Sequence, residues 1–295
     1  MSTTKFLFDR LFIKDLINID QKYLFAINNN IIAQTKFSNI RSLNIFNNTH
    51  ITNISKLKIL HGVNSKTNIN QHTIISANLY DIQIIGSPKI IDVSHMTNLR
   101  ILTASGFYCG ITQECINKLY LLIELNIENN PHITNIGHLV YLKKLNISGY
   151  QCRITQKNIM TLNLVSLDCS SNYRIVDVMH MSNLKILFCN SFSGICQKCI
   201  SGLNLVELHL DHNNKITDVG HMSKLKKLYV CGEFCGINQL SIAKLDLVLL
   251  SVIGNKKIIS VAHMTKLQFL YTDRPIIYTG YLKKVSSMGY LYEKN

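Results

Sequence analysis

Apolar residues recur along the chain in a fixed order that divides it into short repeats. One kind of repeat reads LxxLxIxxNxxITDVxHM, and its clearest copies begin at Leu122, Leu164, Leu205 and Leu247. The other kind reads LxxLxxxxxxCxIxQxxIxxL, and its clearest copies begin at Leu99, Leu142, Leu184 and Leu225. Weaker copies bring the array to twelve repeats of 17 to 23 residues. The chain is therefore built from one supersecondary unit that alternates between two versions.

The two apolar patterns predict different elements. In LxxLxI the apolar residues alternate with polar ones, as in a short strand that buries one face. A strand this short needs a neighbour, and stacked repeats supply one, which predicts a parallel sheet along one side of a solenoid. The spacing of Ile111, Ile116 and Leu119 is helical and predicts a short outer segment that packs against the core.

Two stretches of the array are almost the same. LNIFNNTHITNI begins at Leu43 and LNIENNPHITNI at Leu125, and ten of their twelve positions are identical. One asparagine that both stretches share, Asn48 in the first and Asn130 in the second, stands where the chain turns away from the predicted sheet. Other repeats have Asn172, Asn213 and Asn255 at this position, and one repeat has Ser87. An inward amide there can bond backbone groups of adjacent turns. We therefore interpret the repeated stretch as a structural part of the solenoid. Cys109, Cys152 and Cys235 occupy the equivalent position in repeats of the other kind.

These motifs resemble the leucine-rich-repeat family over roughly residues 40–288. The NNKITDVGHMSKLKKL type is similar to the short internalin repeat, and the CxIxQxxIxxL type is similar to cysteine-containing repeats. The alternation also resembles that of repeat proteins of large DNA viruses of amoebae. The resemblance implies an α/β solenoid with a curved, parallel concave sheet and short helices and turns on its convex side. We expect an N-terminal cap at 1–39, the array at 40–275, and an incomplete final repeat with a cap at 276–295.

Composition narrows the class of protein. Apolar residues make up 47% and charged residues 16%, enough apolar surface for a core, and no apolar stretch reaches the ~20 residues needed to span a bilayer. The N-terminal apolar run is too short and too charged for a signal peptide. Nine cysteines in such a chain indicate reduced thiols. We expect a cytoplasmic protein that is not secreted and not membrane-bound, a host cytoplasm if the viral resemblance holds.

No candidate for catalysis or metal binding stands out. Five histidines belong to HM or HL pairs, namely His95, His138, His180, His221 and His263. Each pair occurs in every second repeat, so neighbouring histidines are separated by two strand spacings, about 10 Å. Zinc ligands must all lie near 2 Å from the ion, so we interpret these residues as turn residues. Cys196 and Cys199 form a lone CxxC, a repeat variant rather than a zinc or redox motif. We expect no enzyme activity, cofactor or metal.

The strand residues that point away from the core remain. In a strand numbered L1-x2-x3-L4-x5-L6-x7 these are positions 3, 5 and 7, and over twelve repeats they hold seven of the 17 acids but two of the 31 basic residues. Even spacing would place about two acids and four bases there. Aromatic residues beside charges on an open face are typical of interfaces, although a merely solvated face is the alternative. The predicted partner-binding residues are Asp81, Glu124, Glu128, Asp168, Glu207, Asp211, Phe188, Tyr229, Phe269 and Tyr271.

The net charge of +14 favours a second reading, because basic residues form their own columns. Position 2 of the second repeat type holds Lys58, Arg100, Lys143, Lys185 and Lys226, and the residue before the turn isoleucine is His50, Lys89, His132, Arg174, Lys215 or Lys257. Such columns could follow a polyanion, or could simply be a solubilising flank.

The favoured function is a monomeric protein–protein interaction scaffold whose concave acidic stripe takes a partner with a basic surface. The alternative is a substrate-recognition adaptor, with residues 1–39 docking onto a larger complex such as a ubiquitin ligase. Nucleic-acid binding comes third.

Overall fold

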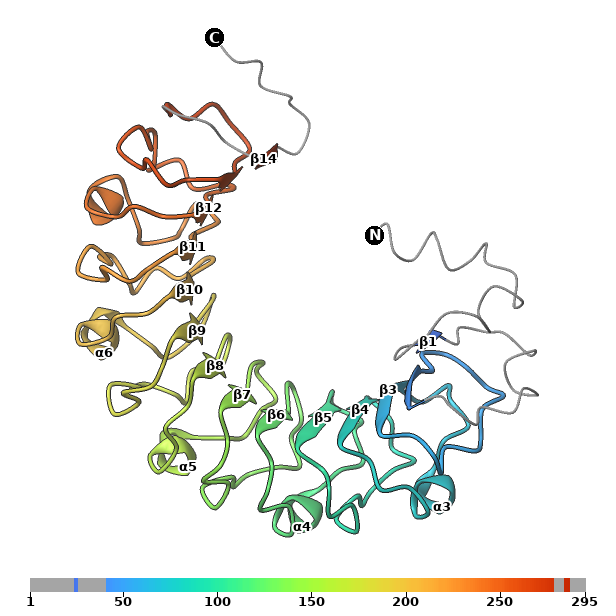
Figure 1. The fold of residues 1–295 in the computed structure, drawn as a ribbon. Helices are drawn as coiled ribbons and strands as arrows, with labels where there is room; N and C mark the ends of the chain where they lie inside the picture. Colours follow the sequence, from blue (N-terminus) through green and yellow to red (C-terminus); the bar gives the residue numbers. More distant parts are fainter. Residues whose placement is uncertain (1–23, 26–40, 279–283, 287–295) are drawn as a thin grey trace, which may run out of the picture. The chain divides into compact units, whose positions relative to one another are not determined.

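A computed structural model of the chain describes residues 24–25, 41–278 and 284–286. These residues fall into two compact units, Met1–Leu122 and Ile123–Asn295. In both units the repeats are successive turns of a coil, with a short strand on the inner side and a turn or short helix on the outer side (Figure 1). The predicted cap at 1–39, apart from a two-residue strand, and most of 276–295 lie outside the described residues, so those boundaries stay predictions.

Among its described residues, the first unit contains five parallel strands in sequence order. They are β1 (Leu24–Phe25), β2 (Ser42–Asn44), β3 (Ile59–Val63), β4 (Asp81–Ile85) and β5 (Ile101–Ser105). The pairing of β3 with β4 shifts register between Leu60 and Val63. In the described part of this unit, the short helices α3 (Gln71–Ile74) and α4 (Gln113–Ile116) lie on the outer side (Figure 1).

Within the described part of the second unit, the pattern recurs with nine parallel strands. They are β6 (Glu124–Asn126), β7 (Lys144–Asn146), β8 (Ser166–Asp168), β9 (Ile186–Phe188), β10 (Glu207–His209), β11 (Lys227–Tyr229), β12 (Leu249–Ser251), β13 (Phe269–Tyr271) and β14 (Lys284–Ser286). The outer side carries α5 (Gln156–Ile159), α6 (Gln197–Ile200) and the 3₁₀ turn η2 (Leu240–Ile242). Each pair is in register, so equal repeat positions face each other across the strands.

The core is the leucine ladder that the spacing predicts. Leu167, Leu187 and Leu208 are the middle residues of three consecutive strands, and each is fully buried. The side chains on either side of each leucine point the opposite way and are half-buried. The predicted fold class is confirmed: the protein is an α/β leucine-rich-repeat solenoid with short helices on the outer side. No helix among its described residues is long and apolar enough to cross a bilayer.

Three members of the asparagine column bond neighbouring coils to one another, as predicted. The side chain of Asn172 donates to the carbonyls of Ile147 and Ile154 at 3.0 and 3.3 Å and accepts from the amide of Arg174 at 3.1 Å. Asn255 repeats this arrangement with the carbonyls of Val230 and Ile237, and Asn213 donates to the carbonyl of Cys189; all three asparagines are fully buried. Each amide therefore satisfies backbone groups that the turn would otherwise leave buried without partners.

The residue just after the strand and before the asparagine column adopts a left-handed backbone in most repeats. At this place Asn129, Ser171 and His212 have φ of 52°, 57° and 57°, and Gly149 and Gly232 have φ of 94° and 96°. Glycine and asparagine tolerate this conformation best and stand there in several repeats, while Ser171, Ser191 and His212 adopt it in others. This column is a turn signal that the leucine pattern alone does not show.

Candidate partner-binding face

Three aromatic rings stack on the inner face of the second unit. Phe188, His209 and Tyr229 occupy position 5 of β9, β10 and β11, and the in-register pairing aligns them. The Phe188 and His209 ring centroids lie 3.8 Å apart with a 21° interplanar angle, and those of His209 and Tyr229 lie 4.0 Å apart with an angle of 8°. The three rings form a continuous, half-buried aromatic surface, which we call the aromatic stack.

Ionised groups hold the central ring in place. His209 Nε2 lies 2.9 Å from a Glu207 carboxylate oxygen, and Lys227 Nζ lies 3.0 Å from the other oxygen. Burial of the Glu207 carboxylate acts to raise its pKa, but the hydrogen bonds from His209 and Lys227 outweigh it and leave the pKa below its usual value. Glu207 therefore stays charged and keeps the imidazole ring oriented between its two neighbours.

The acids do not form the single acidic stripe that we predicted from the sequence. Glu124 and Glu207 stand at position 3, and the lysine at the same position of the next strand lies 2.6 Å and 3.0 Å away, respectively. Asp168 stands at position 5, while Glu128 and Asp211 stand at position 7. The acids thus occupy three columns. Glu124 and Glu207 are paired with lysines of the same chain, which weakens the repulsion between the acids.

Two of the acids also accept hydrogen bonds from backbone amides and so contribute to the fold. Asp168 accepts a hydrogen bond from the amide of Ser170 at 2.9 Å, as Asn146 does from Ser148 at the same repeat position. Asp211 accepts from the amide of Cys231 at 2.7 Å. A carboxylate or amide oxygen at these places closes the end of the strand.

The effect of the negative charge of Asp168 on the stability of the fold can be tested. Burial raises the pKa of its carboxyl, although bonds from Ser170 lower it in part. A raised folded-state pKa means that the ionised form costs stability, so wild-type stability should increase as the pH falls through that pKa. Asp168→Asn keeps the bond from Ser170 and should raise the thermal midpoint at pH 7. This gain should vanish at acid pH, and a variant less stable than wild type at pH 7 contradicts it.

The other predicted site residues lie apart from the stack. Asp81 is in the first unit, where its carboxylate lies 2.9 Å from Nε2 of His61. Glu124 and Glu128 are on and just after β6, and Phe269 and Tyr271 are on β13, each at least two strands away from the stack. His209 was not among the predicted residues, although its place at position 5 between Phe188 and Tyr229 is a signal in the sequence.

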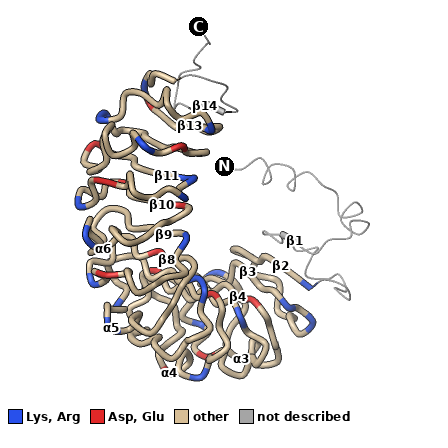
Figure 2. Tube along the Cα trace, turned by 60° about the vertical axis from the view of Figure 1, so that its left-hand side comes forward, with Lys and Arg blue, Asp and Glu red and all other residues tan. Residues whose placement is uncertain are grey.

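One basic column is largely occupied within the chain. The side chains of Lys89, Lys215 and Lys257 donate to carbonyls of Thr67, Ser193 and Cys235 at 2.8, 2.8 and 2.7 Å, and Arg174 donates to Cys152 in the same way. Each cation bonds a turn about twenty-two residues earlier. This column therefore bonds neighbouring coils to one another. Lys and Arg residues lie on many of the coils (Figure 2).

The histidine and glutamine columns are structural as well. Nε2 of His180, His221 and His263 lies 3.0–3.2 Å from the last carbonyl of the preceding outer helix or 3₁₀ turn, which gives these histidines the predicted turn role. The glutamine of CxIxQ was not interpreted from the sequence. Gln197 donates to the carbonyl of Asp218 and accepts from the amides of Thr217 and Asp218, all at 2.9 Å, and so ties the outer segment of one coil to the next.

A second aromatic surface lies along the edge of the second unit, on the loops that follow the strands. Tyr150, Tyr173, Phe192 and Phe234 are each more than half exposed. The rings of Tyr150 and Phe192 lie 6.0 Å apart, and the Arg174 guanidinium lies 4.5 Å from the centre of the Tyr173 ring. We call these four residues the aromatic edge. The sequence analysis missed them because loop positions carry no fixed orientation.

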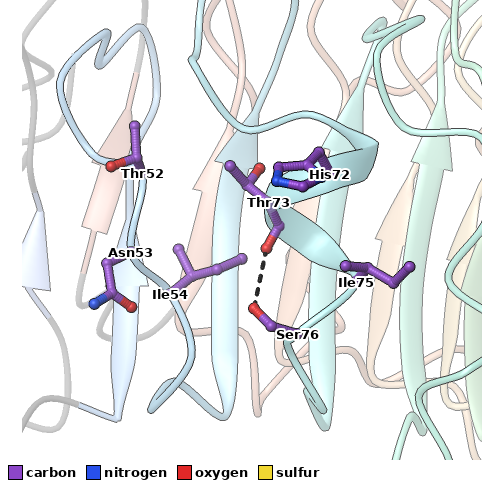
Figure 3. Close-up of a pocket in the computed structure, with 7 residues that line it drawn as sticks. All are labelled: Thr52, Asn53, Ile54, His72, Thr73, Ile75 and Ser76. Atoms are coloured by element: carbon purple, nitrogen blue, oxygen red, sulfur yellow. Dashed lines mark hydrogen bonds between the residues drawn. The ribbon is translucent and has the colours of Figure 1, made fainter.

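A hollow of about 430 Å³ lies beside α3 in the first unit (Figure 3). It is lined by Thr52, Asn53, Ile54, His72, Thr73, Ile75 and Ser76. Its one titratable side chain is His72, and the Ser76 hydroxyl already donates to the Thr73 carbonyl at 3.4 Å. No group of three or more His, Cys, Asp or Glu side chains within the described part of the chain is arranged to hold a metal ion. Its lining holds three hydroxyls and one imidazole and has no Asp, Glu, Lys or Arg side chain.

Comparison with known proteins gives structural likeness at low identity. No protein-family model and no curated protein matches the sequence. An internalin, InlF of Listeria monocytogenes, aligns with a TM-score of 0.46 and 18% identity over 91% of this chain and 83% of its own. InlJ of the same organism, described as having a cysteine ladder, aligns at 0.46 and 20% over 88% and 59%. TLR13, solved with a single-stranded RNA, aligns at 0.44 and 16% over 91% and 53%. The leucine-rich-repeat solenoid fold follows from the order of the parallel strands and from the buried leucine ladder.

Proposed function

We propose that the protein is a non-enzymatic interaction module that binds another protein on the inner face of strands β8–β11. The observation that carries this proposal is the aromatic stack. Its rings cover the middle of an open sheet face, where Tyr and Phe contribute most to protein interfaces. The fold does not need large rings at position 5, because β12 has a serine, Ser251, at the same place.

The charges around the stack indicate the chemistry of the partner. Positions 3, 5 and 7 from β6 to β13 carry six carboxylates and two lysines, a formal balance of four negative charges on a chain of net charge +14. Tyrosine and phenylalanine faces attract guanidinium and ammonium groups, and carboxylates beside them add to that attraction. We therefore infer a partner segment that presents arginine or lysine side chains, and we place the interaction in the cytoplasm.

The test compares two double variants that remove the same residue types. Phe188→Ser with Tyr229→Ser removes the outer rings of the stack, and serine is already accommodated there in β12. Tyr150→Ser with Phe192→Ser removes one Tyr and one Phe from the aromatic edge. Proteins that co-purify with the wild-type chain should be lost from the stack variant by about tenfold or more, since interface anchors contribute ≥2 kcal/mol. They should be kept by the edge variant.

Thermal melts of both variants separate lost binding from lost folding. If the folded stack variant keeps its partners while the edge variant loses them, the binding surface is the aromatic edge. Raised salt should also weaken a charge-guided complex. Co-purification that is insensitive to salt argues against a basic partner.

The two alternatives need their own measurements. Neutralising Lys58, Arg100, Lys143, Lys185 and Lys226 should leave protein partners in place, and loss of a bound nucleic acid in that variant would favour the polyanion reading. Deleting residues 1–39 tests the adaptor reading, because a docking segment predicts that only the larger complex is lost. If neither change alters binding, the inner face carries the function alone.

A further inference from the structure

Two thiols meet on the outer side of the second unit, away from the inner face. The sulfur atoms of Cys196 and Cys199 lie 2.9 Å apart at the start of α6. Cys196 is half-exposed and Cys199 is 8% exposed, and both are free thiols. Six of the other seven cysteines are fully buried within coils, and Cys231 lies on the inner side. The CxxC that the sequence analysis set aside as a repeat variant is therefore an accessible thiol pair.

The repeat geometry forces these two side chains together. The first residue has an extended backbone, with φ −124° and ψ 176° at Cys196, and the residue three positions on lies in the first turn of the helix. In α3 and α5 the same two places hold Asn70 with Thr73 and Thr155 with Asn158, and each pair exchanges hydrogen bonds that cap the helix. In α6 the amide of Cys196 donates to the sulfur of Cys199 at 3.4 Å. A structural cap has thus become a pair of adjacent nucleophiles.

The surroundings give the two sulfurs different reactivity. The Cys199 thiol lowers the pKa of Cys196 by hydrogen bonding to it, and the positive charge of Lys215 acts in the same direction. Burial and the Cys196 hydrogen bond raise the pKa of Cys199. For comparison, burial raises the pKa of Cys115, which occupies the place of Cys199 in α4, to about 12. Since the thiolate is the nucleophile, Cys196 is the sulfur that attacks first.

We propose that Cys196 and Cys199 form a thiol–disulfide exchange site that takes the disulfide of a small thiol compound. The Cys196 thiolate attacks one sulfur of that disulfide, which breaks its S–S bond and releases one small thiolate. Cys199 then loses its proton and attacks the Cys196 sulfur, and the second small thiol leaves. The chain loses two electrons and two protons to form one internal disulfide, and one external disulfide becomes two thiols.

The test uses the reduced full-length protein with glutathione disulfide as the probe. Mass spectrometry after alkylation should find a disulfide between Cys196 and Cys199 that excess reduced glutathione reverses. Cys199→Ser should stop the reaction at a mixed disulfide with one glutathione on Cys196. Cys196→Ser should leave Cys199 unmodified. Cys196 should react on the order of ten times faster or more than the internal control Cys115.

A cap without redox chemistry supplies the matched control. Cys196→Ser with Cys199→Ser keeps hydrogen-bonding side chains at both places, because serine is a favoured N-cap residue, and should melt with the wild type. The proposal is wrong if the pair stays reduced in glutathione disulfide, or if it reacts no faster than Cys115. One equivalent of zinc in the purified protein, lost in this double variant, would also overturn it in favour of a metal site.

Discussion

Leu208→Ala is expected to lower the free energy of unfolding by about 2–5 kcal/mol. Leu208 is the central residue of β10, is fully buried, and is aligned with Leu187 and Leu228 on the neighbouring strands. Removing its side chain leaves a cavity between coils that cannot close, because the strand spacing is set by backbone hydrogen bonds on both sides. In a solenoid such a defect also weakens the coupling between neighbouring repeats.

Urea denaturation followed by circular dichroism measures this loss. The matched control is Leu240→Ala, the same exchange at a leucine that is 84% exposed at the start of η2. It should change the free energy of unfolding by no more than about 0.5 kcal/mol. Equal midpoints for Leu208→Ala and wild type would mean that the leucine ladder is assigned in the wrong register.

The elements that repeat could be predicted from the sequence because one physical rule acts on every copy. A leucine about every twenty or twenty-one residues aligns with its neighbour only if the strands stack in parallel, so Leu187 and Leu208 already imply their pairing. The same argument placed Asn172 and His180 at turns, and both bond carbonyls of earlier coils. Periodicity is a reliable guide when each repeat must solve the same packing problem.

The features of the face that are not repeated could not be predicted in this way. The position of Glu207 was clear, but its bonds to Lys227 and His209 depend on side-chain rotamers and on one particular pair of strands. The same holds for Asp211, whose carboxylate accepts a backbone amide of the next coil. The number of acids at the outward-pointing strand positions predicted that the inner face of the sheet carries negative charge. It could not say which of them are neutralised within the chain.

The CxxC shows the same limit for reactive groups. The sequence analysis placed Cys196 and Cys199 in a repeat, and the structure confirms that placement. The conclusion that a repeat position carries no chemistry does not follow from it. The capping geometry that brings Asn70 close to Thr73 also brings two sulfurs close together. One position can be both structural and reactive here, because the same two thiols that cap helix α6 are nucleophiles.

Asn213→Ala is expected to cost about 1–3 kcal/mol for each backbone group that loses its partner. The Asn213 side chain is fully buried, donates to the Cys189 carbonyl at 2.7 Å and accepts from the amides of Lys215 and Ile216 at 2.9 and 3.2 Å. Alanine fills none of these roles, and water cannot readily reach the interior of the coil. Both Asn213→Ala and Leu208→Ala remove three non-hydrogen atoms, and we expect the total loss of stability to be similar, although here it comes from lost hydrogen bonds.

The adjacent exposed residue provides the control for this prediction. Asn214→Ala makes the same chemical change at an exposed position of the same turn and should leave the urea midpoint within error of the wild type. Asn213→Asp keeps the two acceptor bonds but replaces the donor with a buried negative charge facing a carbonyl, so it should destabilise at pH 7 and recover in part at acid pH as the carboxyl gains a proton. If Asn213→Ala and Asn214→Ala have the same urea midpoint, the asparagine column does not hold the coils together. Hydrophobic contacts between repeats would then account for their stability alone.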